Sequence, residues 1–404
     1  MSELLAPAGT LEKLKWAVQY GADAVYFGIQ SFSLRSYAGN FSIDDVDKGM
    51  AYLRKHQKKG YVTLNIFPWS NEYENLITSA QQLEEIGVDA FIVSDPGVIW
   101  AMKKSGLSTP IHISTQANTV SYQTVLAYSS LGAKRVNLAR ELSLKQIEEI
   151  QSNIKGCDIE TEVFIHGAVC FSYSGRCAIS DYLASRKANR GECTHPCRWK
   201  YHLVEEKRPH EYIPVFEDER GTYLMNTKEL ALFPFVSELK RFGVHSFKIE
   251  GRMKSIHYVA STLAFYRQVL DGKTFTEEDG MVFLNRISNR GYSYGFMKGD
   301  ISPEDYATSK RQSTSFARFV GNVINQTENG HVSINVRNTI HAGETLEVLM
   351  PSGQMKKIVL PESLTLTDHS KVKTANHGMY IHLQADLPLY SILRRIDYLG
   401  ILGK

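Results

Sequence analysis

The sequence has little cysteine, little net charge and no long apolar run. Only five of its 404 residues are cysteine, too few for a disulfide framework in a chain of this size. The 46 basic and 43 acidic residues leave a formal charge of +3, which by itself does not mark a nucleic-acid binder. No stretch reaches the roughly 18 uninterrupted apolar residues of a membrane span, and the first residues show no secretory signal. We therefore expect a soluble, cytoplasmic protein with no membrane partner.

The overall composition is that of a globular protein, with 43% hydrophobic and 22% charged residues. At roughly 100–200 residues per domain, the length predicts two or three domains, or one barrel with an appended domain. A chain of this length buries a large core without disulfides or a metal ion. The cysteines therefore need an explanation other than folding.

Short apolar runs alternate with amphipathic segments along most of the first 250 residues. The runs lack polar alternation, which is typical of parallel strands covered on both faces. Between the first two runs, residues 10–20 are expected to form a helix with Thr10 as its N-cap. There are nine such runs, one more than an eight-stranded barrel requires, and the sequence does not show which of them lies outside the barrel. The nine runs are residues 4–6, 24–28, 61–66, 90–94, 111–114, 136–139, 162–166, 223–226 and 247–250.

A repeated glycine supports this alternation. Gly21, Gly87, Gly132 and Gly243 each lie just before an apolar run. Glycine is favoured at the left-handed position that ends a helix, so each marks a helix end followed by a strand. Sustained alternation of this kind favours an α/β barrel or a doubly wound sheet. We predict a TIM-like (β/α) barrel, because no G-x-G-x-x-G sequence follows the first strand.

Polar residues follow these runs, at the end of the strands where a barrel carries its active site. Loops are polar in any protein, so no single one of these residues is diagnostic. Charge is dense around residues 139–141 and 248–252, which favours a functional role for the set as a whole. Its members are Tyr26, Asn65, Asp95, Gln116, Arg140, Glu141, His166, Lys248, Glu250 and Arg252.

Four of the five cysteines interrupt the alternation within 28 residues. They are Cys170, Cys177, Cys193 and Cys197, and Cys157 lies outside the group. Four thiols this close together in a cytoplasmic chain favour a metal centre over disulfides. Structural zinc prefers two short C-x(2–4)-C pairs, and only the last two cysteines resemble one, whereas iron–sulfur clusters tolerate irregular spacing. The spacing leaves zinc, an iron–sulfur cluster and an unmetallated structural role open.

The C-terminal part has a different pattern. Short alternating runs are separated by the turn sequences Asn329-Gly330 and Pro351-Ser352-Gly353, which is typical of a small antiparallel β-barrel. We expect residues 1–300 to form the α/β barrel, with a cysteine-rich insertion at 162–200, and residues 310–404 to form the small barrel. Basic residues exceed acidic ones around the cysteines and after residue 306, which suits RNA phosphates and equally an ordinary soluble face.

The cysteine segment resembles the signature of a known family. Residues 162–180 carry the pattern E-x-F-x2-G-A-V-C-x4-G-x-C-x-I-S, which closely matches that of peptidase family U32, also called collagenase-like proteases. Within the family, the layout resembles the branch implicated in bacterial tRNA hydroxylation. The resemblance extends to residues 5–9, 21–26, 94–97, 112–116 and 247–254.

The resemblance implies an α/β barrel that binds a 4Fe-4S cluster through Cys170, Cys177, Cys193 and Cys197. It implies an enzyme that converts the wobble uridine of tRNA to 5-hydroxyuridine, without molecular oxygen and with prephenate as co-substrate. Sister branches act on ribosomal RNA or on the ubiquinone ring, so these substrates are alternatives. A peptidase and a non-catalytic RNA-binding scaffold are further alternatives, and the need for a paralogous partner subunit is left open.

The residues themselves argue against proteolysis. The chain contains neither an H-E-x-x-H sequence nor a G-x-S-x-G elbow. A cysteine nucleophile needs an uncoordinated thiol beside a histidine. The best case is Cys170, four residues after His166, and a metal held by the four cysteines would occupy that thiol.

If the substrate is tRNA, a base of the anticodon loop has to leave its stack and enter the barrel mouth, where aromatic rings can stack on it. We expect the stacking residues among Tyr26, Phe27, Phe67 and Tyr173. Gln116 is a further expected substrate-binding residue.

Prephenate is a dicarboxylate, which arginine binds through paired hydrogen bonds. Arg140 and Arg252 are the residues that we expect to bind it, followed by Arg35. For proton transfer we expect His166 and Glu250, because a partly closed, charged site shifts their pKa values. The structural alternative for His166 is a hydrogen bond to the cysteine loop.

Overall fold

The structure is a computed structural model, and its residues pack into two compact units. Side chains are described for residues 2–30, 32–33, 40–170, 227–299, 315–327 and 330–396 and a few in 179–186; four short strands between 203 and 223 are described by their backbone. Unit 1 contains Met1–Val18, Ala22–Met253 and Arg290–Gln312, and unit 2 contains Gln19–Gly21, Lys254–Asn289 and Ser313–Lys404. The domain boundary expected between residues 300 and 310 stays a prediction.

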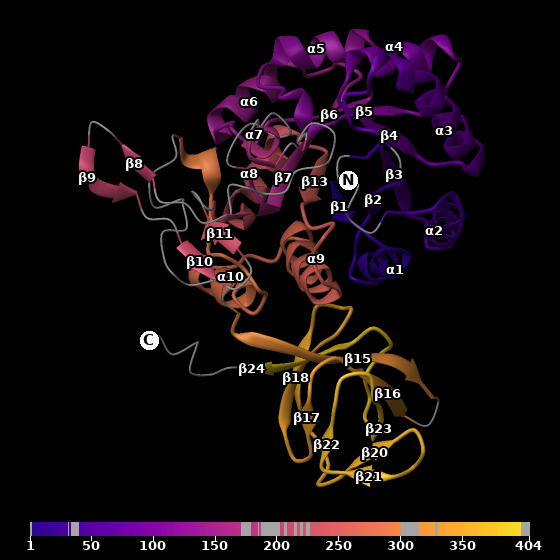
Figure 1. Ribbon diagram of the computed structural model, residues 1–404, viewed down its shortest axis with the longest axis vertical. Helices are drawn as coiled ribbons and strands as arrows, with labels where there is room; N and C mark the ends of the chain where they lie inside the picture. Colours follow the sequence, from indigo (N-terminus) through magenta and orange to yellow (C-terminus); the bar gives the residue numbers. More distant parts are fainter. Residues whose placement is uncertain are drawn as a thin grey trace. The chain divides into compact units, whose positions relative to one another are not determined.

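Unit 1 contains a closed barrel of eight parallel strands. Each strand pairs with the next, and the last pairs with both the first and the seventh, which closes the ring. The predicted TIM-like barrel is therefore confirmed (Figure 1). In barrel order the strands are β1 (Glu3–Pro7), β2 (Ala24–Gly28), β3 (Lys59–Thr63), β4 (Ala90–Val93), β5 (Ile111–Ile113), β6 (Arg135–Asn137), β7 (Glu160–Ala168) and β13 (Ser246–Ile249).

The predicted strand at residues 223–226 is the one outside the barrel. Tyr223 ends β11 (Gly221–Tyr223), which pairs with β10 (Phe216–Asp218) in a separate sheet, and residues 224–226 lie outside the described residues. The chain then forms β12 (Glu229–Ala231), which the sequence reasoning missed and which pairs antiparallel with β7. Three further short strands are β8 (Leu203–Glu205), β9 (Arg208–Ile213) and β14 (Tyr292–Ser293).

Helices connect the barrel strands, and the sequence signals for their ends are confirmed. The N–H of Lys13 donates to the hydroxyl of Thr10 at 3.3 Å, so Thr10 caps the first helix as predicted. The four repeated glycines have φ between 84° and 104°, the left-handed conformation expected where a helix stops. The helices of unit 1 are α1 (Leu11–Gln19), α2 (Ile43–Lys55), α3 (Tyr73–Ile86), α4 (Pro96–Lys104), α5 (Tyr122–Ser130), α6 (Leu144–Asn153), α7 (Ile179–Ala184) and α8 (Val236–Phe242).

Unit 2 contains the antiparallel, strand-rich domain that was predicted, together with two helices that were not predicted for it. The helices are α9 (Ile256–Leu270) and α10 (Glu277–Leu284). The eight strands of its sheet pair in the order β19 (Met355–Val359), β18 (Thr345–Leu349), β24 (Ile392–Ile396), β15 (Ala317–Gln326), β16 (His331–Val336), β23 (Tyr380–Gln384), β20 (Leu364–Leu366) and β21 (Lys371–Val372). A separate pair is formed by β17 (Ile340–His341) and β22 (Thr374–Ala375).

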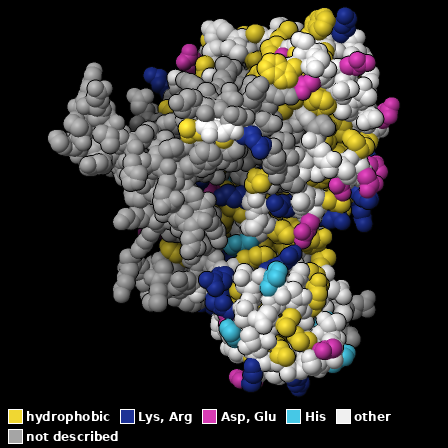
Figure 2. Space-filling model, viewed as in Figure 1, with side chains coloured by type: hydrophobic (Ala, Val, Ile, Leu, Met, Phe, Trp, Pro, Cys, Tyr) yellow, Lys and Arg dark blue, Asp and Glu magenta, His cyan; other side chains and the backbone are white. Residues whose placement is uncertain are grey.

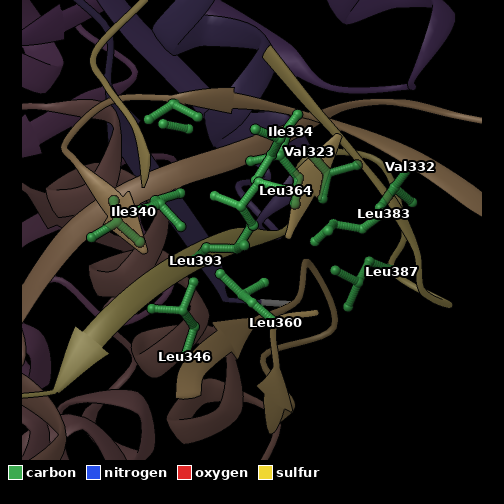
Figure 3. Packing of buried hydrophobic residues seen from close by; sticks show 14 of the residues in the cluster. Val323, Val332, Ile334, Ile340, Leu346, Leu360, Leu364, Leu383, Leu387 and Leu393 are labelled. Carbon is green, nitrogen blue, oxygen red and sulfur yellow. The ribbon is translucent and has the colours of Figure 1, made fainter. Parts of the chain in front are cut away.

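The core of unit 2 consists of branched aliphatic side chains from nearly all of its strands. Leu346, Ile334 and Leu393 are fully buried and converge in this core (Figure 3). The predicted turn at residues 351–353 joins β18 to β19, and the N–H of Gly353 donates to the carbonyl of Met350 at 2.9 Å. Within the described part of the chain, no helix is long and apolar enough to cross a membrane.

Truncation of Leu346 is expected to destabilise unit 2. Leu346→Ala leaves a cavity in a closely packed core, so we expect a loss of about 2–5 kcal/mol of unfolding free energy. Val359→Ala on the neighbouring strand β19 is the matched control, because Val359 is 72% exposed and its truncation costs no more than about 0.5 kcal/mol. Urea unfolding followed by circular dichroism measures both, and equal effects would contradict this core.

Candidate active site at the carboxyl end of the barrel

The interior of the barrel is charged as well as apolar. Successive side chains of a strand point to opposite faces, so alternate residues of each barrel strand face inward. The inward-facing side chains of β1 to β4 form a small apolar layer of Leu5, Ala24, Tyr26, Tyr61, Ala90 and Ile92. On β6, β7 and β13 the inward positions carry Arg135, Glu162 and Lys248 instead, and all three are buried.

Glu162 is the centre of this buried charge. Its Oε1 accepts hydrogen bonds from Nζ of Lys248 and from Nδ2 of Asn137, both at 2.7 Å. Its Oε2 accepts one from the hydroxyl of Ser246 at 3.2 Å and lies 3.6 Å from Nη1 of Arg135. Buried charges are tolerated when they are paired and hydrogen-bonded in this way. Three adjacent strands are thereby joined through one carboxylate.

Arg135 extends the network toward the amino ends of the strands. Its guanidinium binds the carboxylates of Glu3 and Glu160 as well as that of Glu162. Burial opposes the charge on Arg135, but the carboxylates of Glu3 and Glu162 outweigh it and raise the pKa of Arg135. The guanidinium is therefore a permanent positive charge inside the barrel.

His112 stays neutral beside this network. Its ring packs edge-on against the ring of Tyr61, with 4.7 Å between the centroids. Burial, and then the charges of Arg135 and Lys248, lower the pKa of His112 well below its ordinary value. His112 Nδ1 and Asn137 Oδ1 have no hydrogen-bond partner among the described residues. Unsatisfied buried atoms of this kind are where an ordered water or a substrate atom can bind.

Lys248 connects the ionic network to Tyr26 and Glu250. Its Nζ lies 4.5 Å from the centroid of the Tyr26 ring, a cation–π contact. The Tyr26 hydroxyl lies 3.0 Å from Oε2 of Glu250 and 3.0 Å from the carbonyl oxygen of Ile249. Because the ring is only 3% exposed, Tyr26 presents its hydroxyl to the site and no open face for stacking.

Phe27 points to the other side of β2 and stacks on Phe41, with 4.6 Å between the ring centroids, so the expectation that Phe27 stacks on a substrate is wrong.

Arg252 lies just beyond the end of β13 and is buried by polar neighbours. Its Nη2 donates to Oδ1 of Asn40 at 2.7 Å, and its Nη1 donates to the hydroxyl of Ser33 at 3.0 Å. The same Nη1 lies 3.4 Å from the hydroxyl of Thr63. The guanidinium passes so close to β2 that a Cβ on Gly28 would lie 2.2 Å from its Nη2. Glycine at this position is therefore a condition for the placement of Arg252.

Gln116 belongs to a second hydrogen-bonded group at the ends of β3, β4 and β5. Its Oε1 accepts from Nδ2 of Asn65 at 3.1 Å and from the hydroxyl of Ser94 at 3.2 Å, and the hydroxyl of Ser114 also donates to it. Asp95, next to this group, accepts from the N–H of Gly97 at 2.6 Å and caps α4. The expected role of Gln116 in substrate binding stays a prediction. The Asp95 carboxylate is bonded to the first turn of α4, which gives it a structural role as the N-cap of that helix.

His166 on β7 and Glu250, the residue after β13, lie beside each other. The N–H of Glu250 donates to the carbonyl oxygen of His166 at 2.8 Å, and the imidazole lies 5.5 Å from the ring of Tyr292. A Cβ on the next residue, Gly167, would lie 2.3 Å from the carbonyl oxygen of Glu250, so the two strands approach this closely only with glycine there. The structure thus brings together the two residues predicted for proton transfer.

Arg140 follows β6 and lies over the ring of Phe164. The centre of its guanidinium is 3.9 Å from the ring centroid, and no carboxylate pairs with it within the part of the chain that the structure describes. Lys248 Nζ lies 5.2 Å from the same ring. A guanidinium held by an aromatic ring, with its hydrogen-bond donors not committed to an acid, is suited to binding an anionic ligand.

Several predicted residues lie outside the described residues. These are Arg35, Tyr173, Cys177, Cys193 and Cys197. Of the predicted ligand set only Cys170 is described, exposed and two residues beyond the end of β7. Among the described residues, no group of three or more His, Cys, Asp or Glu side chains is placed to hold a metal ion.

Sequence reasoning did not single out most of the neutral side chains of the site. Ser33, Asn40, Thr63 and Ser94 each hydrogen-bond a residue that it did name, and Glu162 organises the interior. A charged residue within an apolar strand was the available signal for Glu162. No comparable signal marks a serine or threonine at a strand end.

Comparison with known protein families matches nearly the whole chain. Residues 9–306 match the family described as Peptidase family U32, and residues 317–394 match its C-terminal domain. Tyr26, Glu250 and Arg252 all lie within the first of these matches.

Three relatives illustrate the activities named among similar proteins. "tRNA hydroxylation protein P" of Escherichia coli is 36% identical over 402 residues, with 87% of each chain covered. A "23S rRNA 5-hydroxycytidine" synthase of the same species is 36% identical over 272 residues, covering 67% of this chain and 39% of that one. A "Collagenase" of Porphyromonas gingivalis is 31% identical over 314 residues, covering 74% of this chain and 73% of that one.

The contact between Gly28 and Arg252 predicts a measurable coupling. Gly28→Ala should displace the guanidinium from Asn40 and Ser33, at a cost of about 1–3 kcal/mol in unfolding free energy, because buried donors lose their acceptors. In an Arg252→Ala background the same change should cost less, because only the contact of the new Cβ with the Ser33 hydroxyl at 2.2 Å remains. Chemical unfolding of the two single variants and the double variant measures the difference. Gly49→Ala, where the atom nearest the new Cβ is a methyl carbon of Leu14 at 3.2 Å, is the control. Additive effects of the two changes would contradict this geometry.

Proposed function

The chain belongs to peptidase family U32, and on that premise we propose that it is a nucleic-acid-hydroxylating enzyme. Its substrate in this proposal is tRNA in the cytoplasm, and its reaction converts the wobble uridine of the anticodon loop to 5-hydroxyuridine. The observation that carries the proposal is the 36% identity with a tRNA hydroxylation protein over 87% of both chains. A relative that makes 5-hydroxycytidine in ribosomal RNA supports the same class of reaction on a pyrimidine base.

The carboxyl end of the barrel offers groups for each part of this reaction. In the proposal, Arg140 binds a carboxylate of prephenate, because its guanidinium is held over Phe164 without an acidic partner in the described chain. Arg252, whose described partners include the neutral oxygens of Asn40 and Ser33, supplies a second positive charge. Glu250, with the Tyr26 hydroxyl 3.0 Å from its carboxylate, holds or moves a proton, and His166 lies alongside.

The proposal includes a 4Fe-4S cluster held by Cys170, Cys177, Cys193 and Cys197. Four thiolates are the ligand set of such clusters, and the exposed thiol of Cys170 follows β7 at the same end of the barrel as the polar site. A bound cluster supplies one-electron transfer or a Lewis-acidic iron. The remaining steps proposed here, the binding of anions and the movement of protons, belong to side chains of the barrel.

A peptidase is the second function that the relatives bring into consideration, because one of them is named a collagenase. A cysteine peptidase requires an imidazole in reach of the nucleophilic thiol. In this chain His166 is buried within the barrel wall, with its ring near Tyr292, whereas Cys170 is exposed. This arrangement favours the hydroxylase proposal over the peptidase.

Nucleoside mass spectrometry of cellular tRNA tests the proposed function. A strain that lacks this protein and any paralogue should lose 5-hydroxyuridine and its derivatives, and the wild-type chain should restore them. Arg140→Ala should restore less than about a tenth of the wild-type amount, because the loss of a charge-assisted pair costs about 1.5–3 kcal/mol in binding. Arg241→Ala, which removes a guanidinium lying 5.3 Å from an exterior ring, Phe242, should restore the full amount. Wild-type tRNA modification in the deletion strain would contradict the proposal.

Iron content tests the proposed cluster separately. Protein purified without oxygen should be brown and contain about four iron atoms per chain. Cys193→Ser should lose that iron because a thiolate ligand is removed, while Cys157→Ser, at an exposed cysteine outside the group, should keep it. Arg140→Ala should keep it too. A colourless protein that contains zinc would overturn the cluster and leave the tRNA measurement to decide the activity.

A further inference from the structure

Trp69 lies at the same end of the barrel as the polar site, in the segment between β3 and α3. Asn65, near the start of this segment, is buried, and its Nδ2 donates to Oε1 of Gln116, which follows β5, at 3.1 Å. Over the next four residues the chain moves outward, and the Trp69 side chain is 54% exposed. A large aromatic side chain is thus presented to solvent four residues from the buried amides of the site.

The backbone that carries this indole is fixed. The N–H of Trp69 donates to Oε2 of Glu72 at 2.6 Å, and the N–H of Glu72 donates to the carbonyl oxygen of Trp69 at 2.9 Å. These reciprocal bonds begin the short 3-10 helix at Ser70–Glu72, and the preceding Pro68 restricts the approach of the chain. Tryptophan has only two side-chain torsions, so its side chain loses little conformational entropy when a ligand binds the ring.

Other apolar side chains are exposed in the loops at this end. Val120, in the loop after β5, and Met253, in the loop after β13, are 47% and 54% exposed. All three loops follow the carboxyl ends of barrel strands, so they lie at one end of the barrel by topology. Single exposed apolar residues are ordinary, but several at the mouth of a polar site point to a ligand with an apolar face.

A nucleobase fits this combination better than an apolar protein surface does. It has a flat face that stacks on an aromatic ring and an edge of donors and acceptors, which suits a site whose strand ends carry the polar group of Asn65 and Gln116. Arg140 after β6 adds a positive charge for a phosphate or carboxylate at the same end. Among the side chains that Figure 2 colours by type, basic and acidic ones are interspersed, so their charge alone does not mark a binding site.

We propose that the indole of Trp69 is the stacking platform for an unpaired base of the nucleic-acid substrate at the barrel mouth. The inference rests on the proposed function, since it takes single-stranded RNA as the ligand class. Trp69 is a positioning residue in this proposal, since it orients the base and takes no part in the transfer of protons or electrons.

Binding of a fluorescently labelled anticodon stem-loop RNA to the full-length protein tests the proposal. Trp69→Ala should raise the Kd by about 5- to 100-fold, the effect of losing one base stack, and Trp69→Phe should recover most of the affinity. Trp100→Ala is the matched control, because Trp100 is 64% exposed on α4 and its ring contacts Lys104, whose Nζ lies 4.9 Å from the ring centroid. Trp100→Ala should leave the Kd unchanged.

A spectroscopic measurement separates stacking from a structural role. RNA binding should quench the tryptophan emission of the wild-type protein, and Trp69→Phe should abolish most of that quenching while leaving the thermal unfolding midpoint unchanged. Equal losses of affinity in Trp69→Ala and Trp100→Ala, or no loss in either, would overturn the proposal.

The proposed function and the stacking role fail in different ways. If Trp69→Ala binds the RNA as tightly as wild type and still restores 5-hydroxyuridine in cells, the stacking role is wrong and the hydroxylase stands. If the wild-type chain binds the RNA through Trp69 but the deletion strain keeps its 5-hydroxyuridine, the hydroxylase is wrong and the stacking role stands.

Discussion

Inside the barrel, the carboxylate of Glu162 accepts hydrogen bonds from Lys248, Asn137 and Ser246 and lies beside Arg135, and the site depends on this one charge. Without it, two cations would be buried next to each other in a medium of low dielectric constant, which is far more costly than in water. Because Glu162 holds the Lys248 ammonium, that ammonium rests against the ring of Tyr26. The Tyr26 hydroxyl in turn meets Glu250, so a buried structural ion pair determines the position of a proposed proton-transfer residue.

At the carboxyl end of the barrel, two close contacts require glycine. Arg252 reaches its acceptors only because Gly28 has no side chain, and β7 approaches Glu250 only because Gly167 has none. Side chains confined in this way at strand ends keep their positions more precisely than side chains on open loops. The loops around them carry Arg140, which lies over Phe164, and the exposed Trp69, whose backbone is bonded to Glu72.

The barrel was predictable because local signals repeat along the chain. Apolar runs without alternation, a Thr10 cap and glycines at the helix ends each follow from backbone sterics, and all but the run at residues 223–226 were confirmed. The site was predictable only in outline: position at a strand end identified Tyr26, Glu250 and Arg252, but not Asn40 and Ser33, which bind Arg252. The expectation for Phe27 failed because adjacent residues of a strand face opposite ways, so Tyr26 and Phe27 cannot both face the interior.

The amino-acid sequence by itself determined the fold class, the family and the end of the barrel where chemistry-bearing residues gather, since these depend on patterns between near neighbours in the chain. Only the tertiary structure decided which side chains meet. Glu162 and Lys248 are 86 residues apart, and Tyr26 and Glu250 are 224 apart. No local pattern encodes such pairs, because closure of the barrel between β13, β1 and β7 is what brings them within hydrogen-bond distance.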